Sequence, residues 1–217
     1  MRTIHFTDPH RRKHFDFFRQ MDQPHFSLTA QVEVTDFLTF REGAGLPFTP
    51  ALVYILTRAA HELPAFRQRI RGEEVVEHEV VHPSFSVLTE ASDVFSFCRV
   101  EYDPAPGVFI ERALDRIGLM QKAPSFENIP GGDNELYLSG IPWVSFTGLT
   151  HAMHYHPVDS VPRISWGKYF ADPTGKVLMP LSVQAHHALV DGRHMGQYFQ
   201  LVMAALADPD AIFSGGR

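Results

Sequence analysis

The chain has 217 residues, the length of one ordinary to large domain. Its hydrophobic content of 44% and charged content of 20% are typical of a soluble globular protein. The formal net charge of −6 provides no general basic surface for a polyanion, which argues against nucleic-acid binding. A single cysteine, Cys98, excludes an internal disulfide and a cysteine-based zinc site.

The sequence also lacks membrane and targeting signals. No apolar run approaches the roughly 20 residues of a membrane span, and the first residues lack the apolar core of a signal peptide. We therefore expect one cytoplasmic domain over residues 1–217 with no membrane partner. The counts of 18 Phe and 13 His are both high, which indicates an aromatic core or pocket and histidines whose roles depend on their neighbours.

The first 63 residues predict two helices separated by a strand. Asp8 stands before a proline, a pattern typical of a helix start, and residues 10–20 form an amphipathic helical pattern. Apolar residues alternate with polar ones over residues 26–34, which predicts a half-buried strand. Thr49, again before a proline, is expected to cap a largely buried helix over residues 51–63.

The middle of the chain predicts short strands followed by a helix. Residues 69–80 indicate a hairpin around Gly72, and two further strands are expected over residues 85–89 and 94–102. A third helix over about residues 108–122 carries one apolar stripe.

The last third predicts three strands and a closing helix. The strands are expected over residues 135–154, 163–170 and 176–186, with a turn at 172–175 between the last two. The helix opens near Asp191, and its apolar face comprises Met195, Tyr198, Phe199, Val202 and Leu206. Strands interspersed irregularly with helices predict an α+β fold, with one mixed sheet and helices packed on one side.

The segment most informative about function is the strand end and loop over residues 178–198. A buried strand delivers His186 and His187 to a loop that carries Asp191. An imidazole at such a position suits general base work near neutral pH. The same pattern fits a hydrogen-bonded pair in a turn, and a third reading is metal binding by these residues with His194. Consecutive histidines are awkward ligands for a tetrahedral site.

The segment HHALVDG resembles the active-site signature His-His-x-x-x-Asp-Gly of the chloramphenicol acetyltransferase family. Other blocks resemble that family in the same order, from about residue 4 to residue 206. They are RRKHFDFFRQ, FSLT, LPAFRQRIRGEEV, VHPSFSV, SGIPWVSFTGL, ISWGKY and KVLMPLSVQ. The resemblance implies the chloramphenicol-acetyltransferase-like fold of CoA-dependent acyltransferases.

The resemblance implies a reaction and its catalytic groups. His187 would take the proton from an acceptor hydroxyl as that oxygen attacks the thioester of acetyl-CoA, without an acyl-enzyme. Ser139 would stabilise the oxyanion, although the residues alone favour a serine that simply ends a strand before a proline. Asp191 would pair with Arg11 as a structural clamp on the catalytic loop, in place of a triad partnership with His187.

The resemblance also implies where acetyl-CoA binds. The cofactor-side candidates are Ser165, Lys168, Tyr169 and Trp143. Lys168 can act as a point charge toward phosphate, or be an ordinary solvated strand lysine. Pro47 stands where the family commonly has a lysine, and Arg163 is a candidate replacement for that charge. No metal cofactor is expected.

The acceptor pocket is less well matched. Its candidate lining residues are Phe17, Phe18, Leu88, Phe95 and Leu149. The three phenylalanines offer the aromatic surface that an arene-bearing alcohol requires, whereas Leu149 differs from the family's usual aromatic residue. Leu88 and Thr89 depart from the residues usual in drug-modifying members of the family. Arg193 replaces a residue that is normally aromatic, and either orients an anionic acceptor or is solvated at a helix start.

Two smaller features are expected to be structural. His151, His154 and His156 include two histidines at alternate strand positions, a spacing that metal sites use, but no facing third ligand is visible. Cys98 lies in an alternating segment and is expected to be a buried small residue.

We expect an enzyme of the antibiotic-resistance type that transfers an acetyl group from acetyl-CoA to a small-molecule alcohol, with chloramphenicol the expected acceptor. The family implies a homotrimer with each active site at a subunit boundary. The alternatives are an acyltransferase of the same fold with another acceptor, and a non-catalytic protein that binds a small ligand. A lipoyl-acylating core of a 2-oxo acid dehydrogenase complex is disfavoured, because such cores carry Asp-His-Arg where this chain has His-His-Ala.

Overall fold

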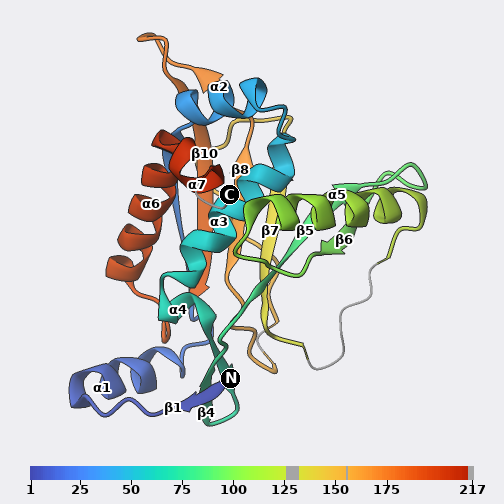
Figure 1. Cartoon of the computed structure of the whole chain (residues 1–217). Coiled ribbons are helices and arrows are strands. Elements are labelled where there is room, and N and C mark those ends of the chain that lie inside the picture. The colour runs from blue at the N-terminus through green and yellow to red at the C-terminus, as the bar shows by residue number, and fades with distance from the viewer. Residues whose placement is uncertain (126–131, 155, 215–217) are drawn as a thin grey trace.

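The computed structural model describes residues 1–125, 132–154 and 156–214. A mixed sheet forms its centre, and α3, α5 and α6 all lie on the same face of that sheet (Figure 1). The helices are α1 (Pro9–Phe18), α2 (Thr35–Gly43), α3 (Phe48–His61), α4 (Pro64–Arg67), α5 (Pro106–Lys122), α6 (Gly192–Ala207) and α7 (Pro209–Phe213). The predicted α+β class, with a mixed sheet covered by helices, is confirmed.

The central sheet has strand order β2-β10-β8-β7-β5-β6, and the two-residue β9 (Phe170–Ala171) pairs with β10 beside this path. The strands are β2 (His25–Glu33), β10 (Val177–His186), β8 (Arg163–Gly167), β7 (Glu135–Ile141), β5 (His82–Leu88) and β6 (Phe95–Arg99). β7 runs parallel to β5 and β8, whereas β10 is antiparallel to β2 and β8. A small second sheet joins β1 (Arg2–Ile4), β4 (Glu74–Glu77) and β3 (Gln68–Arg71).

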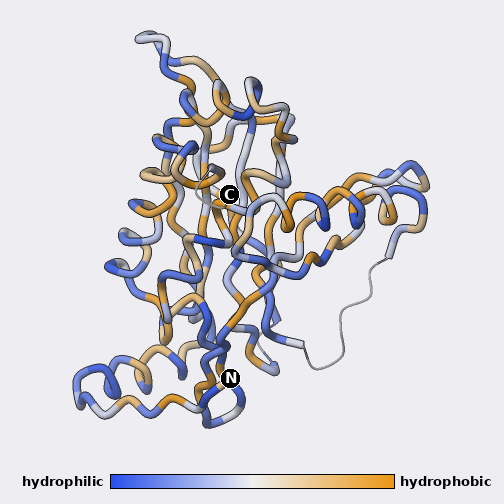
Figure 2. Tube along the Cα trace, in the orientation of Figure 1, coloured by the Kyte–Doolittle hydropathy of each residue, from blue (hydrophilic) through white to orange (hydrophobic). Residues whose placement is uncertain are grey.

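The two faces of the central sheet differ in character because side chains alternate along each strand. Leu181, Val183 and Ala185 of β10 belong to the hydrophobic core under the helices. Ser182 and Gln184, on the opposite face, contact the chain segment that connects β7 to β8. The helices present matching apolar faces, and Figure 2 shows hydrophobic and hydrophilic residues alternating along α6. One face of the sheet is therefore core, and the other is polar.

Several local predictions are confirmed. Asp8 caps α1, since its carboxylate accepts a hydrogen bond of 2.7 Å from the Arg11 N–H. Gly72 turns the hairpin between β3 and β4 with a φ of +60°, a conformation that favours glycine. The five residues predicted to form the apolar face of the last helix are all buried in the core. Cys98 is fully buried as expected, and burial raises the pKa of its thiol to about 12.

The predicted strand over residues 135–154 is wrong beyond Ile141, where β7 ends. The following segment instead crosses the polar face of the sheet. The Leu149 carbonyl accepts a hydrogen bond from the Ser182 hydroxyl, and the His151 N–H donates to the Gln184 side chain at 2.8 Å. Alternation of residue types was misleading here because the segment packs on top of strands and not between them.

Other boundaries also differ from the prediction. α3 begins at Phe48, so Thr49 lies inside the helix and does not cap it. β8 ends at Gly167, where an added Cβ would lie 2.7 Å from Pro180 and 2.8 Å from the Val144 carbonyl. The residue patterns did not predict β1, α2, α4 or α7. Of these, α2 lacks the usual start signal, since Val34 at its N-cap makes no side-chain hydrogen bond to the helix.

Arg69 joins the small sheet to the start of β7. Its side chain is fully buried, and burial lowers the pKa of its guanidinium to about 10, so it remains charged at neutral pH. The guanidinium donates to the carbonyls of Phe66, Gln68, Asp133 and Glu135. A single cation therefore satisfies four carbonyls from two chain segments 64 or more residues apart.

None of the helices in the described part of the chain combines the length and the apolarity that crossing a bilayer requires.

We predict that Arg69→Ala destabilises the fold severely, because it leaves several buried carbonyls without a donor at about 1–3 kcal/mol each. Chemical denaturation of the two proteins would show a loss of several kcal/mol in the free energy of unfolding. Arg71→Ala is the matched control: this neighbouring arginine is exposed and its ion pair with Asp133 contributes no more than about 1 kcal/mol. Equal losses in the two variants would contradict the structural role of Arg69.

Candidate active site

His187 lies at the first position after β10, where the chain leaves the sheet and turns toward α6. Its backbone N–H donates a hydrogen bond of 2.7 Å to the Pro24 carbonyl, which fixes the start of the loop against the chain entering β2. The ring is partly exposed, whereas the next three residues are buried. The loop therefore presents one imidazole to solvent and anchors itself in the core immediately afterwards.

Aromatic rings hold the His187 imidazole. Phe18 stacks on it with 3.8 Å between ring centroids and an interplanar angle of 13°, and Phe26 lies at 4.4 Å. His14 approaches edge-on at 5.5 Å. The Nδ1 atom is buried and has no partner among the described residues, whereas Nε2 is neither buried nor hydrogen-bonded there. Nε2 is thus the nitrogen available to an incoming group.

Arg11, on α1, anchors the loop that follows His187. Its guanidinium donates to the carbonyls of Ala188 at 2.8 Å and Leu189 at 2.9 Å, and contacts His14 Nδ1 at 3.0 Å. The role of His14 was not predicted. The spacing of Arg11 and His14 indicates this contact, because residues three apart lie on one face of a helix.

Asp191 caps α6. Its carboxylate accepts hydrogen bonds from the N–H groups of Arg193 at 2.9 Å and His194 at 3.2 Å, and the Asp191 N–H donates to His194 Nδ1. The predicted ion pair between Asp191 and Arg11 is not formed in the described structure, because backbone groups already occupy both charged groups. Nor does Asp191 contact His187, as a catalytic triad would require.

His186 faces away from the exposed imidazole of His187. It is 1% exposed, its Nδ1 accepts the Ala188 N–H at 3.2 Å, and it lies edge-on to His25. Burial, together with the nearby His25, lowers the pKa of His186 to about 3. His186 is therefore a neutral structural group at physiological pH.

Ser139 lies near the end of β7, on the polar face of the sheet. Its hydroxyl is 3.1 Å from that of Ser86 on β5. Both serines, with Phe95, line two separate cavities of about 450 Å³ and 630 Å³. The smaller cavity, which we call the polar-face cavity, extends toward His151 and Arg163; the larger, the Trp143 cavity, extends toward Trp143 and Phe48.

Most of the predicted CoA-side residues gather at one end of the sheet. Trp143 is 68% exposed and lines the larger cavity with Phe48. Tyr169 packs against Phe48 with 6.0 Å between the ring centroids. Lys168 is exposed, and its N–H donates to the Val144 carbonyl at 2.9 Å. Pro47 is the N-cap residue of α3. It occupies the position at which the family commonly has a lysine, so that positive charge is missing here.

Two predicted cofactor residues lie elsewhere. Ser165 is fully buried and hydrogen-bonded to His151 at 3.0 Å, so it presents no free hydroxyl to a cofactor. Arg163 forms an ion pair of 2.6 Å with Asp159 and lines the polar-face cavity. It lies at the opposite end of β8 from Lys168, so it does not replace the charge missing at Pro47.

The predicted acceptor-pocket residues do not come together within one chain. Phe18 covers His187, and the 62% exposed Phe17 lies beside Phe18. Phe95 and Leu88 line the cavities at Ser139 instead. Leu149 is half-buried in the segment that crosses the sheet.

His187 and Ser139 of the same chain are too far apart to act on one substrate. Ser139, Ser165 and Ser182 are in register across β7, β8 and β10. His187 lies five residues beyond Ser182, so it is about 16 Å further along the sheet and about 10 Å across it. No rearrangement of side chains closes such a gap.

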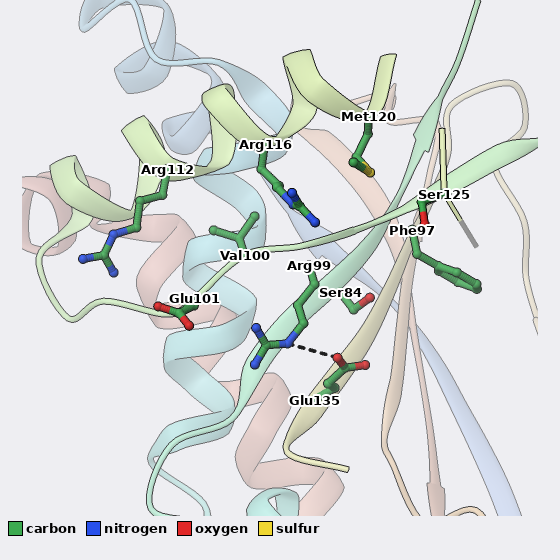
Figure 3. Close-up of a pocket in the computed structure, with 10 residues that line it drawn as sticks. All are labelled: Ser84, Phe97, Arg99, Val100, Glu101, Arg112, Arg116, Met120, Ser125 and Glu135. Atoms are coloured by element: carbon green, nitrogen blue, oxygen red, sulfur yellow. Dashed lines mark ion pairs between the residues drawn. The ribbon is translucent and has the colours of Figure 1, made fainter. Parts of the chain in front are cut away.

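A third cavity, of about 350 Å³, lies between α5 and the edge of the sheet (Figure 3). Arg116 points from α5 toward Arg99, which forms an ion pair of 3.1 Å with the buried Glu135, whereas Arg112 extends to the side and pairs with Asp103 at 3.2 Å. It contains none of the predicted site residues. Among the described residues, no group of three or more His, Cys, Asp or Glu side chains is arranged to hold a metal ion.

Comparisons with known proteins bear on this geometry. The family model described as chloramphenicol acetyltransferase matches residues 1–202. A chloramphenicol acetyltransferase from Klebsiella sp is 31% identical over 199 residues, covering 90% of this chain and 89% of that protein. One from Escherichia coli is also 31% identical, over 197 residues with the same coverage.

Solved structures agree with the sequence comparisons. A chloramphenicol acetyltransferase structure superposes with a TM-score of 0.80 at 25% identity, covering 94% of this chain and 99% of that one. The cubic core of the pyruvate dehydrogenase multienzyme complex superposes with a TM-score of 0.68 at 16% identity, covering 98% of this chain and 93% of that one, which reflects a shared fold.

We predict that Asp191→Ala lowers stability through loss of the helix cap, by about 0.5–2 kcal/mol. For a chain of this size that corresponds to a fall in Tm of about 2–6 °C. Asp191→Asn is the matched control, because asparagine caps helices as well as aspartate does. If Asp191→Asn were as unstable as Asp191→Ala in thermal unfolding, the charge and not the cap would be the source of the effect.

We also predict that acid destabilises the fold through its buried histidines. The pKa values of His186 and His151 are depressed, mainly by burial, to about 3 and about 4. As the pH falls below about 6.5, these histidines take up protons in the unfolded chain but not in the folded chain. The free energy of unfolding is therefore highest above that pH and declines below it. Tm measured from pH 7.5 to 5 should fall less steeply for His186→Gln than for the wild type. The exposed control His10→Gln should keep the wild-type slope.

Proposed function

The chain belongs to the chloramphenicol acetyltransferase family and is an acetyltransferase, and we propose that it acetylates a hydroxyl of chloramphenicol with His187 as general base. The observation that carries the proposal is the partly exposed His187 ring, whose Nε2 is free among the described residues while stacking on Phe18 fixes the plane of the ring. A base must be positioned before it can remove the proton of a weak nucleophile such as an alcohol.

In the proposed reaction, the acceptor hydroxyl gives its proton to His187 Nε2 as its oxygen attacks the thioester carbon of acetyl-CoA. The resulting oxyanion accepts a hydrogen bond from the Ser139 hydroxyl. Collapse of the tetrahedral intermediate breaks the carbon–sulfur bond, and the CoA thiolate recovers the proton from His187. No acyl-enzyme forms, so the direct transfer needs both substrates bound at once.

The two cavities that share Ser139 suit such a two-substrate reaction. The Trp143 cavity has a mainly apolar lining that includes the exposed Trp143, which fits the arm of acetyl-CoA. Lys168, whose N–H is bonded to the Val144 carbonyl next to Trp143, is the candidate contact for the phosphates. The polar-face cavity would then hold the acceptor. The two substrates would meet where the cavities share Ser139 and Ser86.

The separation of His187 from Ser139 within one chain supports a site assembled from two copies. We propose a homotrimer in which the His187 loop of each subunit projects against the Ser139 cavities of its neighbour. A ring of three identical, head-to-tail contacts creates three equivalent sites.

We predict that His187→Ala lowers kcat by about 10²–10⁴ and Ser139→Ala by about 10²–10³ in a thiol-release assay with acetyl-CoA and chloramphenicol. Both variants should keep the wild-type Tm and elution volume in gel filtration. Full turnover by His187→Ala would contradict the assignment of the base.

The shared site has its own test, in which the two inactive variants are co-expressed. Random mixed trimers would regain about a quarter of the wild-type sites, because one contact in four combines an intact His187 with an intact Ser139. Mixing His187→Ala with a double His187→Ala, Ser139→Ala variant provides the control and should regain nothing. Mixed trimers that are verified by mass spectrometry and remain inactive would contradict assembly of the site from two chains.

A further inference from the structure

We propose that His151 determines acceptor specificity by hydrogen-bonding a second polar group of the acceptor, so that the enzyme prefers alcohols with a hydroxyl or amide close to the reacting hydroxyl. The inference rests on the proposed function and extends it to a substrate class. It starts from the polar-face cavity, which His151 lines together with Ser139.

The position of His151 is fixed from two sides. Its backbone N–H donates to the Gln184 side chain at 2.8 Å, and Gln184 also accepts the Ser27 hydroxyl at 3.1 Å. Its ring Nε2 is 3.0 Å from the Ser165 hydroxyl. The ring is therefore held in one orientation before any ligand arrives, which lowers the entropic cost of using it for recognition.

One ring nitrogen of His151 remains available. Nδ1 has no hydrogen-bond partner among the described residues, and it does not belong to the fully buried polar atoms that lack one. Burial, with a contribution from Arg163, lowers the pKa of His151 to about 4, so the ring is neutral at physiological pH. A neutral ring bonded to Ser165 at Nε2 can offer one further hydrogen bond, as donor or acceptor, at Nδ1.

The distance to the reaction centre defines the acceptor class. Ser165, which holds the His151 ring, is the Cα partner of Ser139 on the adjacent strand, one spacing of about 4.8 Å away. Ser139 and His151 line the same cavity, so a ligand with its reacting hydroxyl beside Ser139 presents a neighbouring polar group to His151. Acceptors of this kind include 1,2- and 1,3-diols and their amide counterparts.

The rest of the cavity is consistent with a polar acceptor. Ser84, Ser86 and Tyr137 add hydroxyl groups, and the Arg163–Asp159 ion pair lies at the same wall. Phe95 supplies an aromatic surface on the β6 side. The cavity thus combines one aromatic surface with several hydrogen-bonding groups, whereas the lining expected from the sequence consisted of apolar residues only.

The test compares chloramphenicol, a 1,3-diol, with its analogue that lacks the secondary hydroxyl, in the full-length protein. Wild type should favour the diol by about tenfold in kcat/KM, the value of one hydrogen bond to an otherwise unpaired group. His151→Leu should reduce this preference to near unity and leave the KM for acetyl-CoA unchanged. His151→Gln, which keeps a hydrogen-bonding side chain, should restore part of it.

The control is His156→Leu, an exposed histidine of the same segment that does not line the cavity, and it should keep the wild-type preference. An unchanged preference in His151→Leu would overturn the inference. A loss of Tm in His151→Leu without a change in preference would assign His151 a purely structural role, and would overturn it equally.

Calorimetric titration of the same two alcohols, without acetyl-CoA, separates the inference from the proposed function. If neither alcohol is acetylated but wild type binds the diol more tightly than His151→Leu does, the proposed function fails and the specificity role stands. If wild type acetylates both alcohols equally well, the proposed function stands and the specificity role fails. If the protein neither acetylates nor binds either alcohol, both are wrong.

Discussion

The strand register of the central sheet keeps His187 and Ser139 of one chain apart. The proposal of a site shared between two chains depends on that separation. The register is fixed by nine consecutive pairs between β2 and β10 and by four between β8 and β10. A shift by one residue would exchange the buried Leu181 and Val183 with Ser182 and Gln184, so slippage is strongly disfavoured. In the proposed trimer, the base and the oxyanion donor therefore come from different copies of the chain.

In the proposed trimer, each half of the site is held rigid by contacts within its own chain. The His187 half rests on Arg11, which binds two loop carbonyls, and on Asp191, which caps α6. The Ser139 half rests on the polar face of the sheet, where the segment between β7 and β8 is tied down at Leu149 and His151. Preorganised halves of this kind lose little conformational freedom when they meet, which favours both assembly and catalysis.

The sequence was sufficient for features that depend on local rules. The alternation of apolar residues located β2, and Asp8 and Asp191 marked the starts of α1 and α6. The buried strand ahead of it placed His187 at the start of a loop, as observed, and the resemblance to a family of acetyltransferases is confirmed by the comparisons. These predictions succeeded because capping and side-chain periodicity act over a few neighbouring residues.

The sequence was insufficient where long-range contacts decide. Nothing in the chain order indicated that residues 142–154 cross the sheet, because the Ser182 and Gln184 side chains that hold them lie about 30 residues further on. The expected Arg11–Asp191 pair failed for a related reason. Backbone carbonyls and N–H groups compete for a charged side chain, and they are invisible to reasoning from residue types alone.

The crossing segment links the fold to the chemistry of the acceptor. Gly167 lets it approach β8, since an added Cβ would meet the Val144 carbonyl at 2.8 Å. The segment contributes to both cavities at Ser139, because Trp143 lines one of them and His151 lines the other. In the proposed site, substitutions on this segment would therefore alter the lining of both cavities while the strands beneath it, with Ser139, stay in place.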